Sequence, residues 1–295
     1  MHTPAIDEPL VRLLVATQFP HWSGLPLHAV DPGGWDHKMF RLGDRMVVRL
    51  PSAAAYEHQV EKEWNFLPAL APFLPLRIPV PVAIAQPANG YPWKWSIYDW
   101  IDGETATLDS IANLEQFALA LARFLIALHG IDPAGGPAPG PHNYYRGGSP
   151  NIYDGETRQA IELLGARIDA ESAARIWNKG LKSSWNYPPV WVHGDISPAN
   201  LLVNDGQLAA VIDFGLLAVG DPACDLAIAW TLFDSQTRSS FRKTLPLDRS
   251  TWARGCAWAL WKALIVASGL SATNALSRAK ALRVIDEIIG DEYDS

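Results

Sequence analysis

Three oxygen-bearing side chains lie close together in the sequence and could carry out metal-assisted chemistry. Asp195 and Asn200 lie five positions apart, and Asp213 follows in the segment Val211–Gly215. Carboxylate and carboxamide oxygens are hard ligands that suit Mg²⁺, which usually binds one or two carboxylates together with substrate phosphates. A further carboxylate can orient a hydroxyl group and accept its proton. The three residues therefore predict phosphoryl transfer, for which a protein supplies mainly positioning and charge stabilisation.

The segments around these residues explain how the side chains could meet. The apolar strand Val190–Val192 leads Asp195 into a loop that contains Pro198. A β-hairpin is expected over residues 201–212, with Asn204-Asp205-Gly206 at its turn, and it returns Asp213 to the same place. Turn capping beside a buried strand would explain a lone aspartate better, but the combined spacing favours chemistry.

The same stretch carries a family resemblance. His193-Gly194-Asp195, Asn200 and then Ile212-Asp213-Phe214-Gly215 resemble the H-x-D-x-x-x-x-N and D-F-G elements of the protein-kinase-like superfamily. The block from Gly220 to Ala227 resembles the GDPxxDLA pattern of the aminoglycoside-phosphotransferase family. Protein kinases instead have Arg in the first motif and an activation segment that ends in A-P-E, and the sequence has neither.

The resemblance implies a role for each motif residue. Asp195 is expected to be the catalytic carboxylate that faces the acceptor hydroxyl. Asn200 and Asp213 are expected to hold Mg²⁺ against the phosphates of ATP or GTP. His193 would shape the loop from within, and Asp225 would brace it from the start of a helix, where a carboxylate suits the helix dipole.

The nucleotide site is less clearly marked. Arg49 stands where kinases of this superfamily have a phosphate-binding Lys, and a guanidinium can bind phosphate bidentately. Its expected partner is Glu63 on the following helix, with Glu61 and Glu57 as rivals; the alternative is that Arg49 simply points into solvent.

Two other segments are expected to contact the nucleotide. Backbone groups near Asp99, Trp100 and Ile101 would bind the purine. The turn Pro32-Gly33-Gly34-Trp35 is a candidate loop over the phosphates, although Gly-Gly turns are common.

We expect an α+β, protein-kinase-like fold with two lobes. Residues 1–101 would form an N-terminal nucleotide-binding lobe, an antiparallel sheet with one helix that Ser52 caps. Residues 102–295 would form a mostly α-helical catalytic and acceptor-binding lobe. Strands are predicted at 27–31, 36–42, 45–50, 82–85 and 95–100, and helices at 114–129, 155–179, 252–270 and 275–289.

The acceptor should bind beside Asp195, and its identity stays open. Acidic residues could hold a cationic acceptor such as an aminoglycoside; the candidates are Asp154, Glu156, Asp234, Asp291, Glu292 and Asp294. Periodicity places Trp252, Trp258 and Trp261 in the core rather than in a binding wall. The Gly/Pro-rich segment Pro133–Pro150 is expected to be an exposed loop or a lid.

Composition excludes several other classes of protein. The formal net charge of −7 argues against a nucleic-acid binder, which needs a basic face. No apolar run reaches the roughly 18 residues of a membrane span. The N-terminal segment lacks the basic start and apolar stretch of a signal peptide, so we expect a cytoplasmic protein.

Two alternatives to an aminoglycoside kinase remain. The acceptor could be a macrolide, a sugar or an amino alcohol, because fold does not determine substrate. The chain could also be a pseudokinase that only binds nucleotide. Arg49 in place of Lys favours that interpretation, whereas the complete set of Asp195, Asn200 and Asp213 argues against it.

Overall fold

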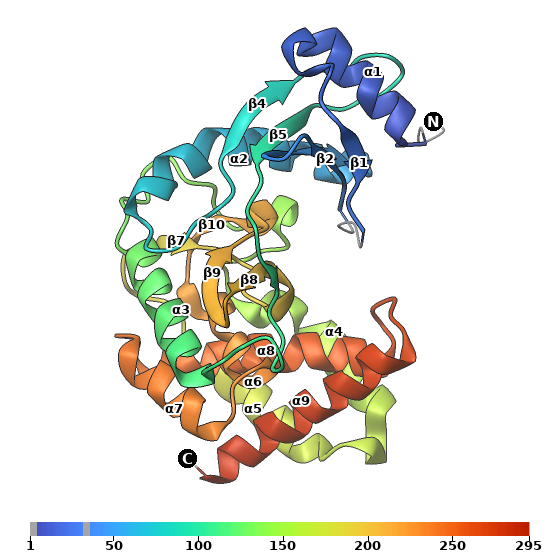
Figure 1. The fold of residues 1–295 in the computed structure, drawn as a ribbon. Helices are drawn as coiled ribbons and strands as arrows, with labels where there is room; N and C mark the ends of the chain where they lie inside the picture. Colours follow the sequence, from blue (N-terminus) through green and yellow to red (C-terminus); the bar gives the residue numbers. More distant parts are fainter. Residues whose placement is uncertain (1–4, 32–35, 295) are drawn as a thin grey trace. The chain divides into compact units, whose positions relative to one another are not determined.

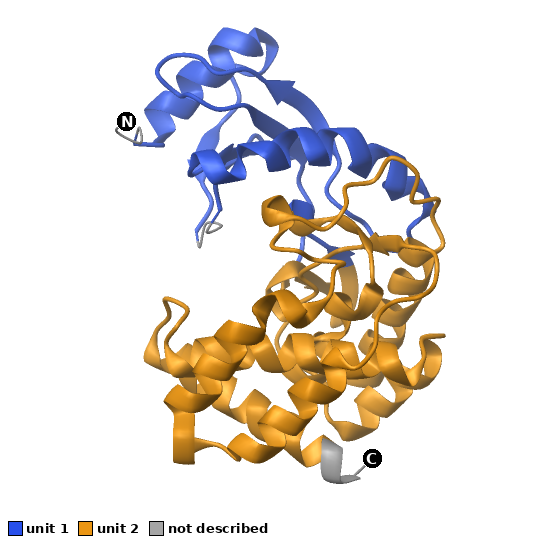
Figure 2. Cartoon of the chain, turned by 180° about the vertical axis from the view of Figure 1, so that it is seen from behind, with its two compact units in different colours: residues 1–103, 210–215 blue, residues 104–209, 216–295 orange. Residues whose placement is uncertain are grey.

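The computed structural model describes residues 5–31 and 36–294, without the side chains of 292–294. The chain forms two compact units (Figure 2). Unit 1 contains residues 1–103 and 210–215, and unit 2 contains residues 104–209 and 216–295. The roles predicted for residues 1–101 and 102–295 stay predictions.

Unit 1 contains a five-stranded antiparallel sheet in the order β1-β2-β3-β5-β4 (Figure 1). Its strands are β1 (Leu27–Ala29), β2 (His37–Leu42), β3 (Met46–Pro51), β4 (Pro81–Ala85) and β5 (Trp95–Asp99). The strand predictions are confirmed, because short β-branched and aromatic runs between turn residues formed these elements.

The one helix predicted for unit 1 is α2 (Glu57–Leu70), and its start differs from the prediction. A short 3-10 helix precedes α2, and the hydroxyl of Ser52 donates to the carbonyl oxygen of Asp36 at 2.8 Å, so Ser52 is not the N-cap. Trp64, which was expected on the apolar face, is 37% exposed.

A second helix in unit 1, α1 (Glu8–Gln18), was not predicted. Asp7 caps it by accepting the N–H of Leu10 at 3.0 Å, and a proline occupies its first turn. Val11, Leu14 and Val15 of α1 join the hydrophobic core beside the sheet.

Unit 2 is mostly helical. Its helices are α3 (Leu114–His129), α4 (Asp154–Leu164), α5 (Ala170–Leu181), α6 (Ile228–Thr231), α7 (Ser235–Thr244), α8 (Arg249–Ser268) and α9 (Ala275–Asp294). The helix predicted over 155–179 is two helices, because Gly165 with φ 50° ends α4 and Asp169 caps α5.

Helix α8 is the centre of unit 2 and packs on α4, α5 and α9 (Figure 1). A Cβ on Gly180 of α5 would lie 2.5 Å from that of Ala257, so α5 and α8 approach each other closely. Trp252, Trp258 and Trp261 of α8 are buried, as predicted.

Two small sheets carry the motif residues. Strand β7 (Val190–Val192) pairs antiparallel with β10 (Ala218–Gly220). The second sheet has the order β6-β8-β9, where β6 is Glu104–Thr105, β8 is Leu201–Asn204 and β9 is Gln207–Val211. The predicted hairpin is thus confirmed, and φ values of 49° at Asp205 and 76° at Gly206 suit a two-residue turn.

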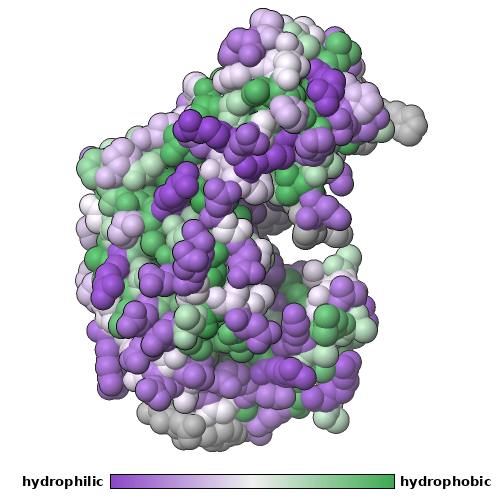
Figure 3. Space-filling view, viewed as in Figure 1, coloured by the Kyte–Doolittle hydropathy of each residue, from purple (hydrophilic) through white to green (hydrophobic). Residues whose placement is uncertain are grey.

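The observed elements are those of the predicted α+β class. On the face shown in Figure 3, hydrophilic and hydrophobic residues are interspersed, as is usual for a globular protein. Within the described part of the chain, no helix is both long and apolar enough to cross a lipid bilayer.

Candidate phosphotransfer site

The loop after β7 is braced by one buried carboxylate. Asp225 accepts the backbone N–H of His193 at 2.8 Å and that of Gly194 at 2.7 Å, which is the bracing role predicted for it. Burial raises the pKa of Asp225, and the opposing effect comes from His193, these N–H groups and Arg146.

Gly194 gives this loop its shape. Its φ is 88°, and a Cβ at this position would lie 2.6 Å from the carbonyl oxygen of Leu216. Only glycine meets both conditions without strain. The tight turn therefore fixes the direction in which the next residue, Asp195, leaves the loop.

Asp195 and Asn200 lie together in unit 2. The Nδ2 group of Asn200 donates to the carbonyl oxygen of Asp195 at 2.9 Å and to its Oδ2 at 3.0 Å. Because the nitrogen of the carboxamide makes these bonds, Oδ1 of Asn200 is the atom left for a cation.

Arg49, Glu63 and Asp213 lie together in unit 1. A guanidinium nitrogen of Arg49 lies 2.9 Å from the carboxylate of Glu63, and another lies 3.6 Å from Asp213. Tyr98 also donates its hydroxyl to Glu63. The pairing predicted for Arg49 is confirmed, and the alternative that it points into solvent is wrong.

The two rival glutamates have other partners. Glu61 pairs with Lys94, and Glu57 accepts the backbone N–H of Lys94 at 3.2 Å. The Nε group of Arg49 is buried without a partner among the described residues. This donor therefore lacks an acceptor within the described part of the chain.

Asp213 is held in an unusual conformation. Its φ is 64°, and its side chain is 44% exposed. Non-glycine residues in this region are uncommon and cluster at functional sites. Burial raises the pKa of the neighbouring Asp36, and repulsion from Asp213 raises it further. A cation between these two carboxylates would relieve that repulsion.

Lys62 was missed by the sequence analysis. Its buried ammonium donates to the carbonyl oxygen of Gly215, two residues after Asp213. Burial lowers the pKa of Lys62 to about 8, although the nearby charges of Glu63 and Asp213 act to raise it. The adjacent Glu63 was predicted because Arg49 needed an acidic partner on the following helix. No feature of the sequence distinguished Lys62 from an exposed lysine.

The two predicted metal ligands, one in each unit, have the oxygen chemistry that Mg²⁺ prefers. Among the described residues, no group of three or more His, Cys, Asp or Glu could hold a metal ion. Mg²⁺ commonly binds one or two protein oxygens and completes its shell with phosphate oxygens and water. The carboxylate of Asp213 and Oδ1 of Asn200 are ligands of that kind.

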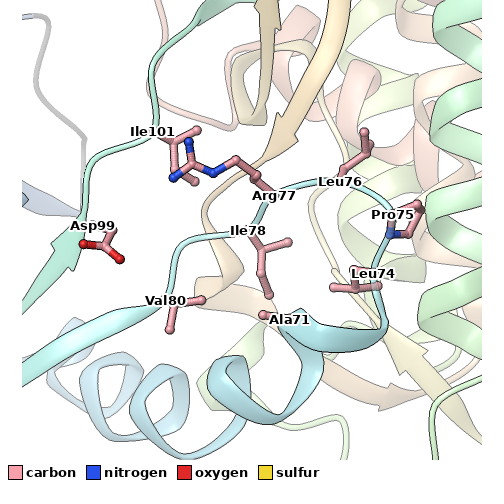
Figure 4. A pocket seen from close by; sticks show the side chains of 9 residues that line it. All are labelled: Ala71, Leu74, Pro75, Leu76, Arg77, Ile78, Val80, Asp99 and Ile101. Carbon is pink, nitrogen blue, oxygen red and sulfur yellow. The ribbon is translucent and has the colours of Figure 1, made fainter. Parts of the chain in front are cut away.

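The segment predicted to bind the purine lines a pocket in unit 1. Asp99 and Ile101 are among the residues around a pocket of about 320 Å³, which Figure 4 shows with Arg77 extending toward Ile101. The backbone N–H of Trp100 already donates to Arg45 at 2.7 Å, so it is not available to a base. The loop candidate Pro32–Trp35 lies outside the described residues.

The carboxylates proposed for a cationic acceptor are engaged within the protein. Asp154 and Glu156 accept indole N–H groups, at 2.8 Å from Trp177 and 2.7 Å from Trp261. Asp234 caps α7, and Asp291 accepts from Arg238 and Trp230. The side chains of Glu292 and Asp294 lie outside the described residues.

The segment Pro133–Pro150 is a loop, as predicted, but only part of it is exposed. Asn143, Arg146 and Gly147 are buried, and the carbonyl oxygen of Gly147 accepts the N–H of Asp221 at 2.7 Å. Gly/Pro content indicated a loop correctly, but it carries no information about tertiary packing.

Comparison with known proteins adds an independent line of argument. The profile of the phosphotransferase enzyme family matches residues 29–258, which include every residue predicted to be catalytic, to bind nucleotide or to bind metal. No curated protein matches the chain by sequence.

Several solved structures share the fold. The GDP complex of wild-type aminoglycoside 2'-phosphotransferase-IIIa is 18% identical over 97% of this chain and 99% of that chain, with a TM-score of 0.72. The streptomycin–ATP ternary complex of APH(2")-IIa is 17% identical over 96% and 97%, with a TM-score of 0.60. Macrolide 2'-phosphotransferase MphH from Brachybacterium faecium is 22% identical over 95% and 98%, with a TM-score of 0.60.

Proposed function

Because the chain belongs to the phosphotransferase enzyme family, we propose that it transfers the γ-phosphoryl group of ATP or GTP to a hydroxyl group of a small molecule. The resemblance found in the motifs is thereby confirmed at the level of the family. The observation that carries the proposal is the braced loop that holds Asp195 against Asn200.

Asp195 is the proposed catalytic carboxylate. The bond from Asn200 occupies Oδ2 at 3.0 Å, so Oδ1 is the oxygen that meets the acceptor hydroxyl. That oxygen orients the hydroxyl and accepts its proton as the new O–P bond forms and the bond from the γ-phosphorus to the leaving nucleoside diphosphate breaks. The two N–H bonds to Asp225 keep the loop fixed while the acceptor binds.

Arg49 is proposed to hold the nucleotide phosphates. The carboxylate of Glu63 pairs with its guanidinium, and the hydroxyl of Tyr98 donates to Glu63. The unpartnered Nε group of Arg49 donates to a phosphate oxygen. Hydrogen bonds between a guanidinium and phosphate are among the strong ones, because both partners are charged.

Asn200 and Asp213 are proposed to hold Mg²⁺. When bound, the ion would stabilise the negative charge on the phosphate oxygens. The left-handed backbone at Asp213 presents its carboxylate at 44% exposure, which suits an ion that arrives with the nucleotide.

The solved relatives support the donor and the acceptor class. They are complexes with GDP or ATP, and two of them also contain kanamycin or streptomycin. An aminoglycoside is therefore one acceptor to test for this chain, together with macrolides, sugars and amino alcohols.

Replacing the catalytic carboxylate tests the proposal directly. Asp195→Asn should lower transfer by about 10²- to 10⁴-fold, because an amide cannot accept the proton. Release of nucleoside diphosphate should be measured with Mg-ATP and Mg-GTP across a panel of the acceptor classes above. The affinity for nucleotide should stay unchanged, since Asp195 meets the acceptor.

Asp205→Asn is the matched control. It makes the same chemical change at the hairpin turn, where φ is 49° and Asn is tolerated, and it should leave transfer unchanged. Transfer by Asp195→Asn at the wild-type rate would sink the assignment. Tight nucleotide binding without transfer to any acceptor would instead favour a binding module.

A further inference from the structure

One buried arginine in unit 2 forms no salt bridge within the described part of the chain. Arg146 is 6% exposed, and no described residue forms a salt bridge or a side-chain hydrogen bond with its guanidinium. Its Nε group is buried without a partner, and so is the indole N–H of Trp258. Burying an unpaired charge is costly, so such a residue is expected to have a role beyond packing.

Aromatic rings surround this guanidinium. It lies 4.8 Å from the ring centre of Trp258 and 5.1 Å from that of Trp261. Tyr153 stacks on Trp261 with centroids 4.0 Å apart and planes at 20°. The rings stabilise the cation by cation–π interaction and leave its in-plane N–H groups for an oxygen acceptor.

The acidic groups near this cluster are already engaged. Glu156 accepts the indole N–H of Trp261 at 2.7 Å. Asp225 interacts electrostatically with Arg146 but directs its oxygens to the N–H groups of His193 and Gly194. The oxygens of both carboxylates are directed to other donors, so the N–H groups of Arg146 are left for an oxygen of a ligand.

The cluster lies next to the catalytic loop. A Cβ on Gly194, the residue before Asp195, would lie 3.0 Å from the Cβ of Arg146. A group bound by Arg146 would thus sit in the same part of unit 2 as the proposed catalytic carboxylate.

The backbone that presents Arg146 is strained and held firmly. Tyr144 and Tyr145 have φ values of 49° and 54°, an uncommon conformation for two successive aromatic residues. The hydroxyl of Tyr153 donates to the carbonyl oxygen of Tyr144 at 2.9 Å. Strain of this kind persists where the surroundings fix a functional geometry.

The geometry points to Arg146 as the binding site for a carboxylate of the acceptor, with the partly exposed ring of Tyr153 against the acceptor's carbon skeleton. The acceptor is then a hydroxylated carboxylic acid rather than a polycationic aminoglycoside. This inference rests on the proposed function, because it places the site beside Asp195.

Calorimetric titration without nucleotide or Mg²⁺ tests the inference. The probes are gluconate, its uncharged counterpart sorbitol, and polycationic kanamycin. Wild type should bind gluconate at least tenfold more tightly than sorbitol or kanamycin. Arg146→Gln should abolish that preference and leave the weak binding of sorbitol unchanged.

Arg242→Gln is the matched control, because Arg242 is an exposed arginine that also lies over a tryptophan, Trp252, at 5.6 Å. It should bind gluconate like wild type. If Arg146→Gln fails to fold, Trp258→Phe removes the indole N–H and keeps one aromatic ring, and it should weaken gluconate binding several-fold.

Three results would overturn the inference: no binding of gluconate or of formate to wild type at 20 mM, equal binding of gluconate by Arg146→Gln, or tighter binding of kanamycin than of gluconate. Arg146 would then serve only as a counter-charge for Asp225. The titration contains neither nucleotide nor Mg²⁺, so failure of the proposed transfer chemistry leaves this measurement intact.

Discussion

Two buried arginines, one in each unit, illustrate different uses of the same side chain. In unit 2, Arg254 donates to Asp221 at 2.6 Å and to the hydroxyls of Ser183 and Thr251 at 2.9 and 3.0 Å. Every nitrogen of Arg254 has a partner. In unit 1, Arg49 is paired with Glu63, yet its Nε group has no partner in the described part of the chain.

This difference separates a structural charge from one that is prepared for a ligand. An ion pair such as Arg254 with Asp221 stabilises the fold, and because every nitrogen of Arg254 already has a partner, no donor is left for another molecule. The group around Arg49 keeps a free donor and a half-exposed carboxylate, Asp213, so it stays incomplete within the protein. Remaining hydrogen-bonding capacity, rather than burial alone, marks the candidate site.

The largest expected effect is on stability and concerns Arg254. Arg254→Ala would leave the carboxylate of Asp221 buried and unpaired, which should cost about 3–5 kcal/mol in free energy of unfolding. Urea denaturation followed by fluorescence measures the change. Arg242→Ala, at an exposed position, should stay within about 0.5 kcal/mol of wild type. Equal midpoints for both variants would contradict the structural role of Arg254.

The second effect concerns nucleotide binding and should spare stability. The double variant Arg49→Met, Glu63→Gln removes both charges, so neither is left buried without its partner, and stability should change by about 1 kcal/mol or less. Affinity for Mg-nucleotide should fall by about 10- to 100-fold, as expected for losing a charged hydrogen bond to phosphate.

Glu61→Gln is the control for this double variant, because Glu61 lies on the same helix but pairs with Lys94. Calorimetry with Mg-ATP and Mg-GTP should give it wild-type affinity. A double variant that binds nucleotide as tightly as wild type would show that Arg49 is a structural charge like Arg254.

The smallest effect is a pH dependence that comes from Lys62. Burial lowers its pKa to about 8, below the value near 10.5 of an unfolded chain. Between these values the unfolded state binds more protons, so the free energy of unfolding should rise with pH. The gain should be about 1–2 kcal/mol between pH 8 and pH 9.5.

Denaturation curves over this pH range check the sign. Lys62→Met should lose the rise, whereas Lys179→Met, at an exposed position of α5, should keep it. A rise of equal size in Lys62→Met would mean that another group titrates.

The sequence predicted best what local chemistry determines. The hairpin turn at Asp205-Gly206 and the strands beside it follow from turn residues and alternation, and the motif spacing identified Asp195 and Asn200. Helix α1 could have been predicted as well, because Asp7 followed by Pro9 is a helix-start signal.

Features that depend on tertiary packing could not be predicted. Ser52 has the residue type of an N-cap, but its hydroxyl donates to the carbonyl oxygen of Asp36, which is distant in sequence. Lys62 and Arg146 are single basic residues without periodicity, so nothing local distinguishes them from exposed ones. Only the fold shows that both are buried.

Unit 1 is built from two pieces of chain that are more than a hundred residues apart. During synthesis, residues 1–103 leave the ribosome first, at roughly 5–20 residues per second. The hydrogen bond from the N–H of Val211 to the carbonyl oxygen of Arg77 cannot form until Val211 is translated. The same holds for the bond from Lys62 to the carbonyl oxygen of Gly215. A nascent N-terminal fragment therefore lacks Asp213 and cannot complete unit 1 until residues 210–215 are translated.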